Sequence, residues 1–213
     1  MKKQFGFTLS EILLATGILG ILIAMITPAI VKISPSVDKA MVRRTYYTIT
    51  TTVSDMINNS LLYQRINNTT SEPYEGFDDQ SSVTFKGKTF SGSTKFVDLF
   101  ISHMNIKGSV STASSNCSAF GSSSCKSVYT TNGSKWSFAY YSAGNTFASK
   151  ILIDTNGDKA PNCYVGKSGD ACSDPDVVYD QFRVWIYNNG KVIIDPTDAW
   201  AAQAIKLGGS LVD

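Results

Sequence analysis

The hydrophobic residues of this chain are concentrated near its N-terminal end. From Ile12 to Val31 the sequence runs for twenty residues without a charged side chain, and fifteen of these residues are apolar. A helix of that length spans about 30 Å, which is the thickness of the hydrocarbon core of a bilayer. The pattern therefore predicts a transmembrane helix.

Two lysines, Lys2 and Lys3, precede this apolar segment. Because positive charge favours the cytoplasmic side, they predict a cytoplasmic N-terminus and place the chain after Val31 on the outer side. A removable secretory signal is the alternative. Its apolar region is usually only about 7–15 residues long and ends at a small-x-small cleavage site. No clear site of that kind follows here.

Beyond Pro35 the hydrophobic positions recur at spacings of three and four: Val42, Tyr46, Ile49, Val53 and Met56. This period predicts an amphipathic helix over about residues 36–63, with its apolar stripe against a sheet. The same spacing predicts a short helix over residues 95–104.

The second half of the chain favours antiparallel strands. Three turn signals separate segments rich in β-branched and aromatic residues: Asn132-Gly133, Gly144-Asn145 and Asn188-Asn189-Gly190. They predict an antiparallel sheet over about residues 127–195, whereas the serine-rich residues 109–127 predict an exposed loop. The expected fold class is α+β, with one long N-terminal helix, half membrane-spanning and half amphipathic, packed on the C-terminal sheet.

Composition excludes some classes of protein. The chain has 213 residues, of which 43% are hydrophobic and 11% aromatic, and its net charge is +2. These values argue against disorder. Nineteen basic residues against seventeen acidic ones leave little positive potential, so a dedicated nucleic-acid binder is not expected.

One carboxylate, Glu11, stands at the start of the apolar segment. A charge within the apolar phase costs about 2.5–3.5 kcal/mol even on lenient scales, which predicts a functional role and a partner. The alternative is a place in the headgroup region, at the positive end of the helix dipole. The run Gly6-Phe7-Thr8-Leu9-Ser10-Glu11, between a short basic leader and an apolar helix, resembles the class III signal of type IV pilins and type II secretion pseudopilins.

This resemblance implies roles for the N-terminal residues. A prepilin peptidase would cleave after Gly6 and methylate the new amine of Phe7, and Glu11 would be the fifth residue of the mature chain. The ammonium of Phe7 would neutralise Glu11 of a neighbouring subunit and set the axial register of assembly. Pro28 lies where many family members carry a proline that kinks the helix. Ser10 departs from the family, in which an aliphatic residue is more usual.

The resemblance also implies an organisation and a function. Residues 1–6 would be a cleaved leader, residues 7–31 the transmembrane and filament-core helix, and residues 32–213 a periplasmic or extracellular pilin-like domain. The chain would be a structural subunit, a pseudopilin or minor pilin, of a type II secretion system or a type IV pilus-like filament assembled from the inner membrane. Its partners would be prepilin peptidase, other pilin or pseudopilin subunits, membrane lipid, and the inner-membrane assembly platform with its ATPase.

Four cysteines follow the apolar segment: Cys117, Cys125, Cys163 and Cys172. An even number on the non-cytoplasmic side favours two disulfides. Three pairings are open, and the simplest joins the first two cysteines and the last two. A zinc site is the alternative, but the spacings lack the two-residue separation of zinc knuckles.

An acidic segment follows the strand predicted to end near residue 153. Asp154, Asn156 and Asp158 alternate possible oxygen ligands, and Asp180 is among the later acidic residues that could complete a calcium cage,. The alternative is an ordinary turn, because Asp and Asn side chains bond to their own backbone. A structural calcium is therefore one prediction, although the expected function requires no cofactor.

The sequence shows no catalytic motif. His103 is the only histidine, and there is no phosphate-binding glycine loop, no HExxH and no G-x-S-x-G. We expect no enzymatic activity. Two alternatives to the structural role are a binding or adhesion minor pilin at a filament tip, and a membrane-anchored periplasmic enzyme.

Overall fold

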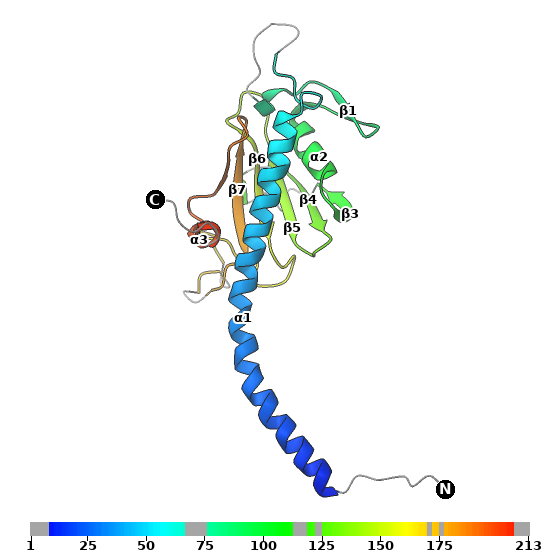
Figure 1. The fold of residues 1–213 in the computed structure, drawn as a ribbon. Coiled ribbons are helices and arrows are strands. Elements are labelled where there is room, and N and C mark those ends of the chain that lie inside the picture. The colour runs from blue at the N-terminus through cyan, green and yellow to red at the C-terminus, as the bar shows by residue number, and fades with distance from the viewer. Residues whose placement is uncertain are drawn as a thin grey trace, which may run out of the picture. The chain divides into compact units, whose positions relative to one another are not determined.

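Figure 1 shows the chain in a computed structural model. The structure describes residues 9–66, 76–112, 119–121, 125–169, 172–174 and 177–206, with residues 25–38 described by their backbone alone. The chain divides into two units, residues 1–39 and 40–213. All of the described strands belong to the second unit, which we call the globular unit.

A six-stranded sheet forms the frame of the globular unit. Each strand pairs antiparallel with the next one along the chain. The strands are β3 (Ile106–Ser111), β4 (Cys125–Thr130), β5 (Lys135–Tyr140), β6 (Phe147–Asp154), β7 (Gln181–Tyr187) and β8 (Val192–Ile194). This sheet and the long N-terminal helix confirm the predicted α+β class.

The second half of helix α1 (Leu9–Asn58) packs across one face of this sheet (Figure 1). The predicted apolar stripe is buried there, and Val42, Ile49 and Met56 are 0% exposed. Helix α2 (Lys95–Ser102) packs on the same core, as predicted from its spacing. Helix α3 (Ala199–Lys206) follows the last strand and buries two alanines.

Shorter elements surround the end of α1. They are the 3-10 helix η1 (Gly76–Asp78), the hairpin strands β1 (Val83–Phe85) and β2 (Lys88–Phe90), and the 3-10 helix η2 (Gly92–Thr94).

Strand β7 shows the period of two that a sheet with one buried face requires,. On β7, Phe182, Val184 and Ile186 are 0% exposed and belong to the core under the helices. Arg183 and Trp185 alternate with them and remain partly exposed. On β7, a polar and an aromatic side chain therefore occupy the sheet face opposite α1.

Helix α1 ends at Asn58, earlier than the predicted end near residue 63. Leu62 and Tyr63 are buried, as the apolar pattern requires, but they lie in a turn in which the Asn59 carbonyl accepts both of their N–H groups. The Asn59 side chain also accepts the N–H of Leu61 at 3.0 Å. Asparagine competes with the helix for the backbone in this way, so the helix ends although the hydrophobic period continues.

The exposed loop predicted over residues 109–127 is shorter in the structure. Strand β3 extends to Ser111, and β4 begins at Cys125. β3 is an edge strand that is almost entirely exposed, and it carries Gly108 at a φ of +80° and an irregular register. A strand with one neighbour and no buried face has little hydrophobic alternation, so the sequence pattern does not predict it.

A buried ion pair connects α2 to the segment after α1. Lys95 Nζ lies 3.0 Å from Asp79 Oδ2, and the two side chains are 2% and 0% exposed. The carboxylate also accepts the N–H groups of Gln64 and Ser81, each at 2.9 Å. Burial alone would raise the pKa of Asp79, but its hydrogen bonds bring that pKa below its ordinary value, whereas burial lowers the pKa of Lys95.

Replacing Lys95 by alanine would leave the Asp79 carboxylate buried without its cation. We expect Lys95→Ala to lower the free energy of unfolding by about 3–5 kcal/mol, the loss that follows removal of one partner from a buried pair. Chemical denaturation of the full chain in detergent, followed by tryptophan fluorescence, measures this loss.

The matched control is Lys126→Ala. Lys126 forms a partly exposed pair with Asp98, with side chains 18% and 30% exposed, and its loss should change the free energy of unfolding by less than about 1 kcal/mol. Equal effects of the two substitutions would contradict the assigned role of the buried pair.

Candidate functional site

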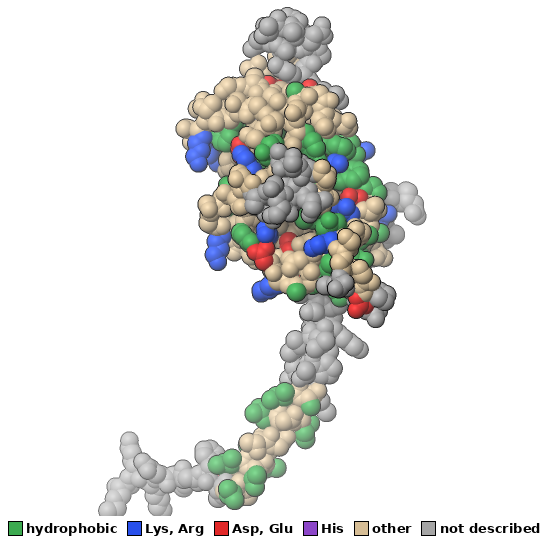
Figure 2. All heavy atoms as spheres, turned by 180° about the vertical axis from the view of Figure 1, so that it is seen from behind, with side chains coloured by type: hydrophobic (Ala, Val, Ile, Leu, Met, Phe, Trp, Pro, Cys, Tyr) green, Lys and Arg blue, Asp and Glu red, His purple; other side chains and the backbone are tan. Residues whose placement is uncertain are grey.

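The first described turns of α1 carry large aliphatic side chains on every side. Nine leucine and isoleucine residues between Leu9 and Ile23 are 49–78% exposed. Figure 2 shows hydrophobic side chains covering this segment. The described hydrophobic core contains none of them, since its first member along the chain is Val42. A helix that is apolar all round needs lipid or other helices around it, so residues 9–24, the apolar helix, form a contact surface.

Thr16 and Glu11 are among the polar side chains of the apolar helix. The Thr16 hydroxyl donates to the carbonyl oxygens of Ile12 and Leu13 at 3.0 Å, so it is satisfied within the helix. Glu11 lies in the first turn of α1 and is exposed. In apolar surroundings an ionised carboxylate is costly, and a neighbouring cation lowers that cost.

Other predicted residues of this segment fall outside the description. Gly6 and Phe7 precede the described residues, and the Pro28 side chain lies among residues 25–38. The α1 backbone is helical through position 28, and the kink there stays a prediction. The predicted membrane segment, residues 7–31, likewise lies partly outside the description.

Among the described residues, no helix combines the length and the apolar character needed to cross a bilayer.

The second half of α1 has an outer face opposite its buried stripe. A shallow hollow of about 500 Å³ on this face is lined by Arg44, Tyr47, Thr48, Thr51 and Thr52. Tyr47 is 56% exposed. This outer face is therefore largely exposed.

In the acidic segment, Asp180 serves as an anchor for the loop between β6 and β7. Its carboxylate accepts the backbone N–H groups of Asn162 (2.9 Å) and Cys163 (2.6 Å) and the side-chain amide of Asn156 (3.0 Å). The structure therefore brings the predicted residues Asn156 and Asp180 together. Three N–H donors already surround this carboxylate, which leaves it little capacity for a metal ion.

Asp154 contacts Gln181, a residue that sequence reasoning missed. Gln181 Nε2 donates to Asp154 Oδ2 at 2.7 Å, and the N–H of Asn156 donates to Oδ1 at 3.2 Å. Asp154 and Gln181 are 3% and 7% exposed. The oxygens Asn156 Oδ1 and Gln181 Oε1 are buried without a hydrogen-bond partner among the described residues. The only signal in the sequence for Gln181 was its place directly after Asp180.

Asp158 lies apart from this group. It is exposed, its carboxylate pairs with Lys135 Nζ at 2.7 Å, and it accepts the hydroxyl of Tyr129. Within the part of the chain that the structure describes, no three Asp, Glu, His or Cys side chains are placed to hold a metal ion. Asp154 and two amide oxygens would supply fewer oxygens than the six to eight that calcium prefers. Calcium binding stays a prediction.

A disulfide closes the loop that holds Asp180. Cys163, whose N–H donates to Asp180, is bonded to Cys172, with 5.4 Å between their Cα atoms. This bond is one half of the simplest predicted pairing. Cys125 is disulfide-bonded too, and Cys117 lies outside the described residues.

The raised pKa of Asp154 makes the stability of the folded protein depend on pH. Burial, opposed in part by the hydrogen bond from Gln181, raises this pKa from 3.8 to about 6. Between about pH 4 and pH 6 the folded protein therefore holds a proton that the unfolded chain releases. Stability falls as the pH rises through this range, and above it the ionised carboxylate opposes folding by up to about 3 kcal/mol.

Asp154→Asn should remove this unfavourable charge. We expect the melting temperature at pH 7 to rise, and to change less between pH 4 and pH 6 than in the native protein. A half-turn of the Gln181 amide would let Oε1 accept the new N–H group. Thermal unfolding of the full chain in EDTA measures this, with Asp158→Asn as the exposed control. A lower melting temperature for Asp154→Asn at pH 7 would show that the ionised carboxylate is favourable.

The same thermal unfolding, repeated with calcium chloride in place of EDTA, tests the metal prediction. Calcium held by the Asp154 carboxylate should raise the melting temperature of the native protein and not that of Asp154→Asn. Equal melting temperatures in calcium and EDTA would contradict calcium binding.

Comparison with known proteins yields a match at the N-terminus. Residues 1–27 match a family model described as the prokaryotic N-terminal methylation motif, which is the signature of prepilin-type signals. This match confirms the resemblance carried by Gly6 to Glu11. No curated protein and no solved structure matches the chain significantly.

Proposed function

We propose that this protein is a structural subunit, a pseudopilin or minor pilin, of a type II secretion system or a type IV pilus-like filament. The methylation motif at residues 1–27 supports a pilin-like subunit that prepilin peptidase processes. The α+β globular unit agrees with that class of subunit. One observation carries the proposal, namely that this motif coincides with an apolar helix whose side chains the chain leaves exposed.

In this proposal the apolar helix occupies two environments in turn. Before assembly it anchors the subunit in the inner membrane by a single pass, with the globular unit on the periplasmic side. After assembly it packs among the helices of other subunits. Burying each leucine or isoleucine contributes about 1.5–3 kcal/mol in either place, so extraction exchanges one set of apolar contacts for another. The assembly platform and its ATPase supply the work, and the role requires no catalytic residue.

Two glycines of the apolar helix, Gly17 and Gly20, support close packing of these helices. A Cβ added at Gly17 or Gly20 would meet no described atom within 4 Å. Small residues of this kind let a second helix approach closely in an apolar phase.

The proposed partner of Glu11 is the methylated ammonium of Phe7 on a neighbouring subunit. Each charge alone is unfavourable in apolar surroundings, and the two become tolerable as a pair. Because such a pair forms at one relative position of two helices, it fixes the axial register of assembly.

Processing can be tested by mass spectrometry of the protein from membranes. We expect a chain that lacks residues 1–6 and begins at N-methylated Phe7. Gly6→Ala should leave the chain unprocessed, because the peptidase cleaves after that glycine, whereas the control Gly17→Ala should be processed normally. Any other mature N-terminus, or normal processing of Gly6→Ala, would contradict the proposed function.

Assembly can be tested separately with Glu11→Val. This variant should be cleaved normally yet form few or no filaments, because the Phe7 ammonium loses its counter-charge. Glu11→Gln, which keeps the shape and removes the charge, should show the same defect. Asp55→Val likewise replaces a carboxylate by valine, at an exposed position of α1 in the globular unit, and serves as the control. Electron microscopy and immunoblots of sheared fractions measure the filaments. Normal assembly of Glu11→Val would contradict the proposed role of Glu11 in fixing the axial register.

A further inference from the structure

A leucine in the turn after α1 lies outside the core. Leu61 is 81% exposed, which is the largest exposed fraction among the large hydrophobic residues of the described chain. In the globular unit the next values are 63% for Val178 and 57% for Ile66. An apolar side chain exposed to this extent is unfavourable in water and gains free energy when another surface covers it.

The backbone of this turn is fixed on both sides of Leu61. The N–H of Leu61 donates to the Asn59 side chain at 3.0 Å. The Asn59 carbonyl accepts the N–H groups of the two following residues, Leu62 and Tyr63, at 2.9 and 3.1 Å, and both of these residues are buried. Leu61 is therefore held at the surface by its neighbours, and little backbone ordering accompanies a contact that it makes.

The outer face of α1 offers a hollow in which such a side chain can lie. We call it the α1 hollow; its volume is about 500 Å³, and its lining consists of Arg44, Tyr47, Thr48, Thr51 and Thr52. In Figure 1 the second half of α1 lies in front of the sheet, and no described element covers its outer side. The α1 hollow is therefore open to another molecule.

The lining of the α1 hollow provides apolar groups for a contact. The Thr48 hydroxyl donates to the Arg44 carbonyl at 2.9 Å, so its hydrogen bond is made within the helix and its methyl group is left for packing. Tyr47 adds an aromatic ring that is 56% exposed. Arg44 is the only charged residue in the lining, and the carbon stem of an arginine also packs on apolar groups. The α1 hollow therefore suits an aliphatic side chain.

Net charge does not oppose contact between two copies of the chain. The sequence has nineteen basic and seventeen acidic residues, and two of the basic ones, Lys2 and Lys3, belong to the proposed leader. Removal of the leader leaves seventeen side chains of each sign. A chain without net charge associates with itself more readily than a charged one. A second copy is therefore a suitable occupant of the α1 hollow, and it brings its own exposed Leu61.

Anchoring in one membrane fixes the relative direction of two copies. Subunits whose apolar helices enter the membrane in the same sense are parallel, so Leu61 of one copy meets the α1 hollow of another only when the copies are displaced along α1. Thr48 and Leu61 are thirteen positions apart, which corresponds to a displacement of about 20 Å. Such a contact joins two different surfaces, so its repetition produces an open filament rather than a closed dimer.

We propose that Leu61 of one subunit packs in the α1 hollow of a second subunit, which lies parallel to it and displaced along α1. The inference rests on the proposed function and adds a second kind of contact to it. The Phe7–Glu11 pair spans four positions, a displacement of only about 6 Å. Because the two displacements differ, the two contacts connect each subunit to different neighbours along the filament.

Cysteine cross-linking in filaments tests the contact directly. Thr48→Cys and Leu61→Cys are combined in the full chain. A disulfide requires Cα atoms about 4.4–6.8 Å apart, whereas α1 alone extends about 15 Å from Thr48 to Asn58, so a bond between the new cysteines joins two chains. After oxidation we expect a ladder of dimers, trimers and longer species on a non-reducing gel. The matched control combines Thr48→Cys with Val178→Cys, at another exposed apolar position, and should stay monomeric.

The variant Leu61→Lys measures how much assembly depends on the contact. A lysine beside Arg44 places two positive charges together, so the yield of filaments in sheared fractions should fall by about tenfold or more, whereas cleavage after Gly6 continues. Leu61→Met, which keeps a similar apolar side chain, should assemble normally. Val178→Lys makes a comparable change at another exposed position and is the control. Melting temperatures in detergent should match that of the native chain, because both side chains are mostly exposed.

Two results would overturn the Leu61 contact. One is the absence of the ladder in assembled filaments, although both new cysteines react with a maleimide in the solubilised chain. The other is a normal yield of filaments from Leu61→Lys. In each case a processed chain still assembles, so the proposed function stands and only this contact fails. A chain that is not cleaved after Gly6 contradicts the proposed function itself.

Discussion

One helix carries two hydrophobic surfaces, and the chain buries only one of them. The sheet covers the stripe of α1 that contains Val42, Ile49 and Met56. The leucines and isoleucines from Leu9 to Ile23 remain about half exposed or more. Apolar surface of this extent is strongly unfavourable in water. The protein therefore needs an apolar environment that its own fold does not supply. The match at residues 1–27 to a prepilin-type signal indicates that lipid or the helices of other subunits supply it.

Buried carboxylates organise the irregular segments of the globular unit. Asp79 accepts N–H groups of Gln64 and Ser81, Asp180 accepts those of Asn162 and Cys163, and Asp198 accepts that of Arg183: three loops fixed by the same kind of contact. Each carboxylate satisfies backbone donors that no strand or helix satisfies. Asp154 accepts only two described N–H groups, those of Gln181 and Asn156, and burial raises its pKa to about 6. Burial also raises the pKa of Asp198, although Arg183 donates to that carboxylate.

The sequence predicted the features that depend on neighbouring residues. The helix stripe, the hairpin at Asn132-Gly133 and the prepilin-type signal are all local patterns, and the structure or the family match confirms them. The features that it missed depend on residues far apart in the chain. Asp158 pairs with Lys135, and Asp78 shares a pocket with Asn188. The sequence predicts a turn at Asn188 and Asn189, which the structure confirms, but no local pattern shows that a second turn lies against it.

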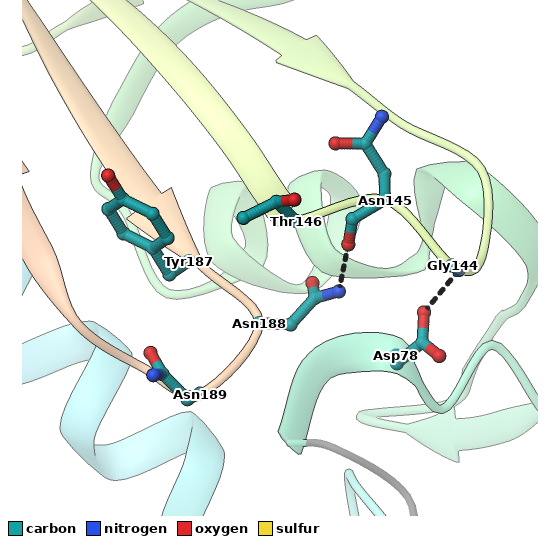
Figure 3. Close-up of a pocket in the computed structure, with 7 residues that line it drawn as sticks. All are labelled: Asp78, Gly144, Asn145, Thr146, Tyr187, Asn188 and Asn189. Carbon is teal, nitrogen blue, oxygen red and sulfur yellow. Dashed lines mark hydrogen bonds between the residues drawn. The ribbon is translucent and has the colours of Figure 1, made fainter.

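The polar pocket lined by Asp78, Asn145 and Asn188 (Figure 3) differs from the apolar helix in what determines it. The apolar helix is defined by composition alone, so many sequences could replace it. The pocket depends on Gly76, since any Cβ there would collide with the Asn188 carbonyl. That contact joins residues far apart in the chain, so a single substitution at Gly76 would displace the wall of the pocket, whereas no single substitution would remove the hydrophobic character of the helix.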